Sequence, residues 1–273
     1  MRLLGVKSWL GIGIIAFFLI IALFSSLIAP YDPNDIVSLP YEQPSGEHWL
    51  GTDRLGRDIF SQLIYGTRLS LLIGVLTGFL MTSISTFFGM ISGYYGGVVD
   101  RILSTITDVF LVIPGIPLMI VISSYIRVRS FWTVILVIAM TGWGGGARII
   151  RSQMLSMKNR DFVTAAKIIG ERNARVIFFE ILPNMLSLIA SIFFSSVLYA
   201  IIGEASLSFL GLGDVSRISW GTMLYWAQSA NALLNRMWPW VLAPGLSIVM
   251  LGTAFALLNF SLDEVTNPRL RKR

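Results

Sequence analysis

Few residues of this 273-residue chain have the chemistry that catalysis or metal binding requires. It has no cysteine and one histidine, His48, which we interpret as a loop residue, so neither a catalytic triad nor a metal site is supported. A phosphate-binding G-x-x-x-x-G-K-[ST] loop needs a glycine directly before its lysine. The four lysines instead follow Val6, Met157, Ala166 and Arg271. We therefore predict no catalytic residue, no metal ligand and no cofactor bound by this chain.

Two acidic residues lie within or beside long apolar runs. Asp108 interrupts the run 102–126, and Glu204 ends the run 181–203. Acidic side chains surrounded by lipid are costly, so they usually face a cavity or a partner. We expect packing or gating contacts for both residues, with direct contact to a substrate as the alternative. A proton-coupled carrier normally needs more such groups.

The most distinctive polar segment lies between two apolar runs, at residues 160–184. As a helix it would carry a narrow face of small residues that includes Ala165 and Ala166. Gly170 then permits a tight turn, because glycine adopts positive φ without penalty. A second helix would run from about residue 173 to Pro183. The pattern indicates a compact helix–turn–helix that fits a groove of another protein, and a plain amphipathic cytoplasmic loop is the alternative.

The elements that position these groups are apolar helices. Hydrophobic residues make up 55% of the chain and charged residues 13%, and the mean hydropathy is +0.73. A helix that crosses a bilayer needs about 20 apolar residues. Six runs qualify, so we predict an all-α integral membrane protein with six transmembrane helices. These runs are 8–31, 69–99, 102–126, 130–147, 181–203 and 237–262.

The first run follows Arg2 and Lys7 and could be mistaken for a secretory signal. It is longer than the apolar part of a typical signal, so we interpret it as a retained first span. Positive charges then set the orientation, because cytoplasmic loops carry an excess of Lys and Arg. With both termini in the cytoplasm, only seven of the 21 Lys and Arg lie outside: Arg54, Arg57, Arg68, Arg127, Arg129, Arg217 and Arg236. This topology explains the pI of 9.8 without nucleic-acid binding.

A long external loop follows the first span. Thr52 or Asp53 is placed to cap a short helix, which suits the membrane interface. A solvated loop is the alternative. The apolar residues on one face of the expected helix are Leu55, Ile59, Phe60, Leu63 and Ile64.

We divide the chain into three parts. Residues 1–68 hold the first span and the external loop with its short helix, residues 69–262 the transmembrane core, and residues 263–273 a basic cytoplasmic tail. The polar loop of the core lies at about 158–183. Pro114 and Pro117 should interrupt the third span, because proline lacks a backbone donor. The glycine-rich segment 142–146 should loosen the inner end of the fourth.

The polar loop resembles the EAA loop of ABC-importer permeases. That loop reads Glu-Ala-Ala, three residues, Gly, nine residues, Ile-x-Leu-Pro. Here Thr164 stands in place of the usual glutamate and Glu180 in place of the usual isoleucine. The other positions agree at the same spacing: Ala165, Ala166, Gly170, Leu182 and Pro183.

Further segments resemble the second permease subunit of dipeptide, oligopeptide and nickel importers. They are His-Trp-Leu-Gly-Thr-Asp-Arg-Leu-Gly-Arg-Asp at 48–58, Gly-Tyr-Tyr-Gly-Gly with Asp-Arg at 93–101, Glu-Ala-Ser-Leu-Ser-Phe-Leu-Gly-Leu-Gly at 204–213, and Asn-Pro-Arg-Leu at 267–270. The resemblance extends from about residue 8 to residue 270. It implies a type I ABC-importer permease in the cell (inner) membrane.

The resemblance also implies partners and roles. The partners would be a homologous second permease, two cytoplasmic ATPases that hold ATP and magnesium, and an extracytoplasmic solute-binding protein. The ATPase-coupling residues would be Thr164, Ala165, Ala166, Gly170, Leu182 and Pro183. The candidates for the external loop and gating would be Asp53, Arg54, Arg57, Asp58 and Glu204, with Asp108 as the polar candidate inside the membrane.

The substrate stays open at this point. Di- and oligopeptides are the first expectation. The ending at residues 259–270 departs from the usual pattern and looks like a branch that includes oligosaccharide importers, and nickel chelates are a third possibility. An autonomous secondary carrier or channel, and a membrane enzyme or scaffold, are alternatives of other classes. Few intramembrane charges and no evident inverted repeat disfavour the carrier.

Overall fold

The computed structural model describes the backbone of residues 6–266 and the side chains of residues 8–260. Most of the expected basic tail, 263–273, lies outside the described residues. In the described part, helices and loops account for the chain, apart from one isolated bridge between Thr52 and Asp58. The elements are α1 (Val6–Leu23), α2 (Ser25–Ile28), α3 (Ile59–Tyr95), α4 (Gly97–Val112), α5 (Gly115–Tyr125), α6 (Phe131–Gly142), α7 (Gly144–Met157), α8 (Asp161–Ile168), α9 (Asn173–Arg175), η1 (Val176–Ile181, a π-helix), α10 (Leu182–Phe209), α11 (Trp220–Ser229) and α12 (Trp238–Thr266).

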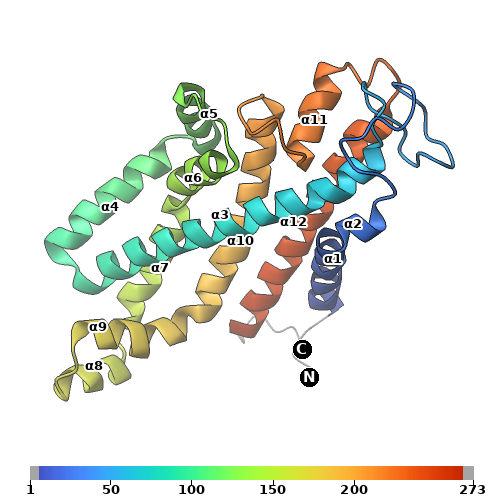
Figure 1. Cartoon of the computed structure of the whole chain (residues 1–273). Coiled ribbons are helices and arrows are strands. Elements are labelled where there is room, and N and C mark those ends of the chain that lie inside the picture. Colours follow the sequence, from blue (N-terminus) through green and yellow to red (C-terminus); the bar gives the residue numbers. More distant parts are fainter. Residues whose placement is uncertain (1–5, 267–273) are drawn as a thin grey trace.

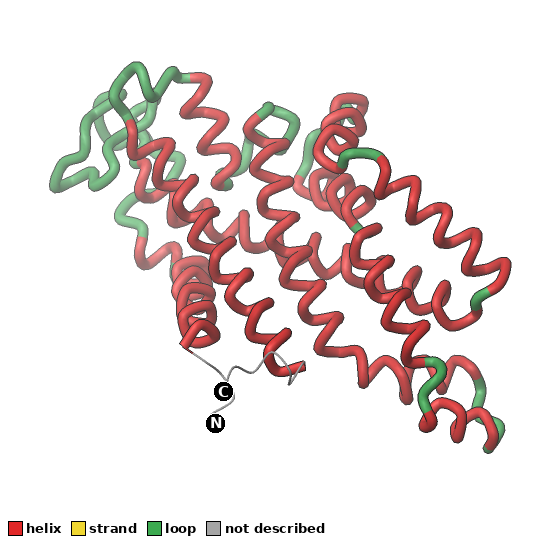
Figure 2. Tube along the Cα trace, turned by 180° about the vertical axis from the view of Figure 1, so that it is seen from behind, coloured by secondary structure: helices red, strands yellow, loops and turns green. Residues whose placement is uncertain are grey.

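The molecule has two distinct ends (Figure 1). At one end, the loop 30–58 and α11 lie together, and Figure 2 shows most of the loop structure gathered there. At the other end α8 and α9 protrude, on the same side as the beginning of α1 and the end of α12. Helix α3 runs between the two ends and packs along α7 and α10.

Several helices are long and apolar enough to cross a membrane. Three qualify alone: α3, the continuous helix Asn173–Phe209, and Trp238–Phe260 of α12. The bent pairs α4 with α5 and α6 with α7 raise the number to five if each pair is one span. The apolar part of α1, Ser8–Leu23, is shorter. The described residues thus hold three to five spans by this measure, and the sixth stays a prediction.

Both expected interruptions of the spans are present. Helix α4 ends at Val112, and α5 begins after Pro114 at an angle of 88°. Helices α6 and α7 meet at Trp143 with a bend of 45°. The first break follows from the missing donor and the backbone restriction at proline. The second coincides with the glycine-rich segment, where helix formers are absent.

Small residues let the central helices approach each other closely. A Cβ atom added at Gly78 of α3 would lie 2.9 Å from the backbone nitrogen of Val197 on α10. One added at Gly89 would lie 2.7 Å from the carbonyl oxygen of Ala147 on α7. Association in lipid depends on such close packing, because water provides no hydrophobic drive there. Glycines on two faces of α3 therefore set how closely α10 and α7 pack against it.

The external loop differs from the expected separate short helix. Residues 53–58 form turns, and Ile59, Phe60, Leu63 and Ile64 belong to the first turns of α3. The capping residue is Asp58, whose carboxylate accepts a hydrogen bond from the Ser61 backbone at 2.7 Å. Since the apolar pattern continues without a break into the second span, the helix that begins here extends through Tyr95.

Buried polar contacts hold this loop in one conformation. The Asp53 carboxylate accepts hydrogen bonds from the backbone of Leu55, the backbone and side chain of Arg57, and the side chain of Gln62. Both Asp53 and Asp58 are buried. Nδ1 of the buried His48 lies 3.0 Å from Oδ1 of Asp58. A buried carboxylate needs such partners. Asp53 and Asp58, with the groups that bind them, therefore stabilise the conformation of the loop.

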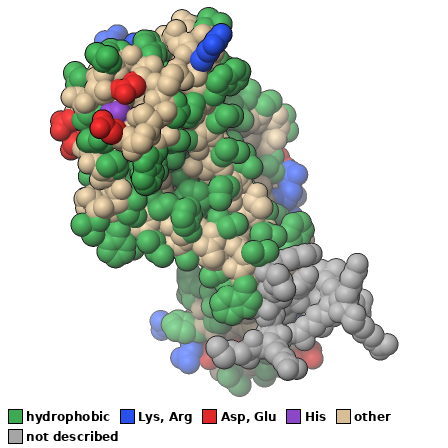
Figure 3. Space-filling model, turned by 90° about the vertical axis from the view of Figure 1, so that its right-hand side faces the viewer, with side chains coloured by type: hydrophobic (Ala, Val, Ile, Leu, Met, Phe, Trp, Pro, Cys, Tyr) green, Lys and Arg blue, Asp and Glu red, His purple; other side chains and the backbone are tan. Residues whose placement is uncertain are grey.

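The surface between the two ends is largely apolar. In Figure 3 hydrophobic side chains cover much of the visible face, and charged side chains lie mostly toward its upper and lower ends. The large apolar side chains that are exposed on the transmembrane helices include Leu72, Phe79, Leu136, Met140, Leu186 and Val249. Such a band suits the hydrocarbon core of a bilayer.

Replacing Gly56 by alanine should destabilise the protein. Gly56 has φ +81°, and an added Cβ would lie 2.1 Å from the carbonyl oxygen of Ser38. We expect Gly56→Ala to cost about 2 kcal/mol or more, from left-handed strain and steric overlap together. Thermal unfolding of the purified protein, followed by tryptophan fluorescence, measures this. Gly46→Ala is the matched control, since no atom lies within 4 Å of its added Cβ. An equal loss of stability in the two variants would contradict the strained, close-packed conformation assigned to Gly56.

Candidate functional site

The polar loop folds as the expected helix–turn–helix, which we call the knob (residues 158–183). Gly170 has φ +84° and ends α8. Its backbone nitrogen donates to the carbonyl oxygen of Lys167, and Glu171 donates to that of Ala166. This pair of bonds is the glycine-terminated helix end known as the Schellman motif. The turn therefore depends on glycine in the way that the sequence predicts.

The two alanines of the motif face different ways. Ala166 is buried and belongs, with Val163 of α8 and with Val176 and Ile181 of η1, to one hydrophobic cluster. Ala165 is exposed, as are Thr164, Gly170 and Pro183, and Leu182 is partly buried. Ala166 thus holds the two halves of the knob together, whereas Ala165 is available to a partner. The sequence pattern alone did not separate these roles.

The tip of the knob presents large apolar side chains to its surroundings. The same region carries Arg160, Lys167, Arg172 and Arg175. Apolar side chains that are exposed together in this way indicate a surface that another molecule covers. These side chains are Phe162, Ile168 and Ile169 of α8 and its C-cap, while Phe178 and Phe179 are exposed on η1, where Phe178 lines a groove between α3 and α10.

A residue that the sequence analysis missed anchors the knob to α3. The hydroxyl of Tyr94 donates to Oδ1 of Asn173 at 2.8 Å. The ammonium group of Lys167 lies 5.1 Å from the centre of the Tyr94 ring, within range of a cation–π contact. The signal for Tyr94 in the sequence was its place in the permease-like segment 93–101, at the glycine-rich end of a predicted span.

Glu204 anchors α11 to α10 at the opposite end. It is buried, and its Oε1 accepts hydrogen bonds of 2.7 Å from the hydroxyls of Ser208 and Ser219. Ser219 is also the N-cap of α11, in a capping box with Thr222. The second carboxylate oxygen of Glu204 is buried with no hydrogen-bond partner among the described residues.

One of the external-loop candidates, Arg54, contacts α11. The guanidinium of Arg54 lies 4.5 Å from the centre of the Trp226 ring. Arg57 pairs with the buried Asp53 at 2.7 Å. Arg54 and Glu204, which are far apart in sequence, therefore both contact α11 or its N-cap, whereas Asp53 and Arg57 order the loop itself.

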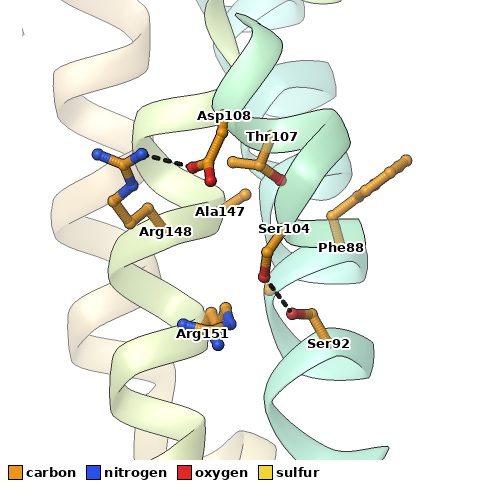
Figure 4. Close-up of a pocket in the computed structure, with 9 residues that line it drawn as sticks. Phe88, Ser92, Ser104, Thr107, Asp108, Ala147, Arg148 and Arg151 are labelled. Atoms are coloured by element: carbon orange, nitrogen blue, oxygen red, sulfur yellow. Dashed lines mark hydrogen bonds and ion pairs between the residues drawn. The ribbon is translucent and has the colours of Figure 1, made fainter. Parts of the chain in front are cut away.

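Asp108 lies away from both ends, beside a cavity of about 340 Å³ between α3, α4 and α7. Figure 4 shows its carboxylate pointing toward Arg148 of α7, and the two groups are 2.5 Å apart. Nearby, Arg151 makes two hydrogen bonds of 2.6 Å with Asp100 of α4. The sequence analysis did not identify Asp100, Arg148 or Arg151 as site residues. In the part of the chain that the structure describes, no group of three His, Cys, Asp or Glu residues could hold a metal ion.

These features define a multi-pass membrane protein with a protruding knob at one end and a braced loop at the other. Residues 85–272 match the family described as the inner membrane component of binding-protein-dependent transport systems. This match covers more than half of the chain, which therefore belongs to that family of ABC-importer permeases. The resemblance inferred from the sequence motifs is confirmed.

Several characterised relatives match over nearly the whole chain. The oligopeptide transport system permease protein of Bacillus subtilis (strain 168) is 35% identical over 97% of this chain and 86% of its own length. The dipeptide transport system permease protein of Haemophilus influenzae is 38% identical over 96% and 90%. The glutathione transport system permease protein of Pectobacterium atrosepticum is 35% identical over 92% and 83%.

Removing the side chain of Glu204 should loosen α11. Glu204→Ala leaves two serine hydroxyls without their acceptor and opens a void, for an expected loss of about 2–4 kcal/mol. Glu204→Gln retains an acceptor oxygen and should cost less than half as much. Thermal unfolding of the two variants in detergent decides. Equal losses would show that the charge of Glu204, and not its hydrogen bonds, stabilises this end.

Proposed function

We propose that this chain is one of two permease subunits of an ATP-driven importer that takes up di- and oligopeptides, and that it forms half of the translocation pathway. The relatives support the substrate class, since they are permease proteins of oligopeptide, dipeptide and glutathione transport systems. We take the topology to be six transmembrane helices with both termini in the cytoplasm, as the distribution of Lys and Arg favours.

The observation that carries the proposal is the exposed apolar tip of the knob. Ile168 and Ile169 are 80% and 77% exposed at the end where positive charges gather. A helix that presents such residues fits a groove in a soluble partner. We assign this groove to a cytoplasmic ATPase, with Thr164, Ala165 and Gly170 at the contact and Ala166, Leu182 and Pro183 maintaining its shape.

Three central helices receive any displacement of the knob. Helix α7 leads directly into it, and the ammonium group of Lys158 donates to the carbonyl oxygen of Gly93 on α3 at 3.0 Å. Tyr94 links α3 to Asn173, and η1 continues into α10. Closure of the ATPase dimer on ATP would thus tilt α3, α7 and α10 together. The nucleotide drives the change because the inward- and outward-facing states bind it with different affinities.

The remaining partners follow from this arrangement. A second ATPase would bind the knob of a homologous second permease, and the ATPases would hold ATP and magnesium while this chain itself stays non-catalytic. An extracytoplasmic solute-binding protein would dock on the end formed by loop 30–58 and α11. There Asp53, Arg54, Arg57, Asp58 and Glu204 would act in gating by setting the position of α11. Residues 69–262 would form the permeation core.

Replacing Gly170 by valine should uncouple transport. The space around Gly170 is open, so the effect comes from the left-handed backbone, which a β-branched residue disfavours. We expect at least a five-fold loss of both peptide uptake and substrate-stimulated ATP hydrolysis in proteoliposomes, with normal insertion into the membrane. Gly170→Asn is the control, because asparagine tolerates this conformation. If Gly170→Val transports normally, the coupling role is wrong.

Calorimetry on the partner binding protein tests the substrate class. We expect micromolar binding of trialanine, and none of cellotriose or of a nickel–histidine chelate. The unusual ending at residues 259–270 makes the oligosaccharide the alternative to test. Binding of cellotriose without trialanine would overturn the peptide assignment while leaving the coupling mechanism intact.

A further inference from the structure

Two ion pairs beside the same cavity differ in how fully they are satisfied. Asp100 accepts two hydrogen bonds from Arg151 and others from Ser92 and Ser104, and its side chain is 19% exposed. Asp108 makes one contact, with Arg148, and these two side chains are 57% and 60% exposed. Among the described residues no further hydrogen bond to Asp108 or Arg148 is recorded. The first pair braces α4 against α7, whereas the second has unused bonding capacity.

The depth of Asp108 makes its exposure informative. Asp108 lies 11 residues beyond Gly97, which corresponds to about 16 Å along a helix. The apolar run of this span begins at residue 102, so Asp108 lies about 9 Å inside the hydrocarbon core, and Arg148 directly follows the apolar run 130–147 at the inner end of the fourth span. Charged groups at that depth almost always face a water-filled space or a polar partner. We therefore expect the pair to face water or a polar partner and not lipid.

The adjoining cavity has the lining that an aqueous passage requires. Its walls carry the hydroxyls of Ser92, Ser104 and Thr107 next to the charges of Asp108, Arg148 and Arg151 (Figure 4). Its volume of about 340 Å³ is that of a small-molecule site. Only Phe88, Gly89 and Ala147 add apolar surface.

A peptide with free termini matches this pair in charge and in chemistry. Its carboxylate can pair with a guanidinium in the two-pronged geometry that arginine favours, and its ammonium group can pair with a carboxylate. When such a zwitterion enters, one ion pair becomes two, and no charge is left without a partner. Because an unpaired charge is the costly state in a low dielectric, the exchange avoids a large barrier. An uncharged saccharide would gain no comparable contact.

We propose that Asp108 and Arg148 form a station on the translocation pathway, at which Arg148 binds the carboxylate terminus of a passing peptide and Asp108 its ammonium terminus. The station rests on the proposed function, since it needs a zwitterionic substrate. The pair opens as the peptide arrives and closes again when it leaves. Asp100 and Arg151 keep the two helices at a fixed distance meanwhile.

The first experiment removes both charges together, so that neither is left unpaired. Asp108→Asn/Arg148→Gln is assembled with the partner permease, the ATPases and the binding protein in proteoliposomes. We expect trialanine uptake to fall at least five-fold, while assembly and the melting temperature are unchanged and ATP hydrolysis stays within two-fold. The matched control, Asp100→Asn/Arg151→Gln, should lower the melting temperature. Normal uptake by the Asp108/Arg148 variant, or a loss of stability equal to that of the control, would overturn the station.

The second experiment uses the absence of cysteine in this chain. Ser104→Cys places a thiol in the cavity wall, and Ile106→Cys places one about 200° around α4 from Asp108. In the assembled complex, a charged water-soluble thiol reagent should modify Ser104→Cys at least ten-fold faster. Trialanine delivered by the binding protein should slow that reaction at least three-fold. An unreactive Ser104→Cys, or a reaction that trialanine does not slow, would refute the station.

Failure of the proposed function gives a different result. If the unsubstituted complex takes up no trialanine, the peptide assignment is wrong and the station fails with it. If the unsubstituted and the Asp108→Asn/Arg148→Gln complexes take up trialanine equally well, the importer assignment stands and only the station is overturned.

Discussion

The close packing of α3 against α7 on one side and α10 on the other is the constraint on which the rest of the structure depends. Lipid offers little hydrophobic drive for helix association, so contact area and shape decide. Glycines on two faces of α3 bring its neighbours within backbone distance. The three helices therefore pack as one unit, and each of them contacts or continues into the knob. A larger side chain at these positions would force α7 or α10 away from α3.

The polar residues of the chain divide into two kinds by their partners. Asp53, Asp58 and Asp100 have several hydrogen bonds each and lie where loops or helix ends must be fixed. Buried carboxylates of this kind define a conformation because every alternative leaves a charge without partners. Asp108 has one partner and a wide exposure instead. The buried carboxylates of the external loop therefore have the geometry of a scaffold.

Much of this architecture could be predicted from local patterns. Uncharged runs located the long helices, Pro114 located the sharpest bend, and the position of Gly170 located the turn of the knob. The limits were equally physical. The helix beginning at Ile59 was divided in two because its first turns resemble an interfacial segment. Tyr94 with Asn173, and Arg151 with Asp100, are 79 and 51 residues apart, and no local periodicity pairs such residues.

The arrangement of the arginines connects the knob to the cavity. Arg148 and Arg151 are three residues apart on α7, so both face α4 across the same gap. Helix α7 is also the segment that enters the knob, whereas both acidic partners lie on α4, which does not. A displacement of the knob in the proposed mechanism therefore moves guanidinium groups relative to carboxylates. Asp100 and Arg151 are joined by two hydrogen bonds and lie nearer the knob. In this mechanism their pair resists separation, and α7 turns about it relative to α4. Asp108 and Arg148 are joined by one hydrogen bond, so their pair opens first. A charged substrate would be released at this point of the proposed pathway.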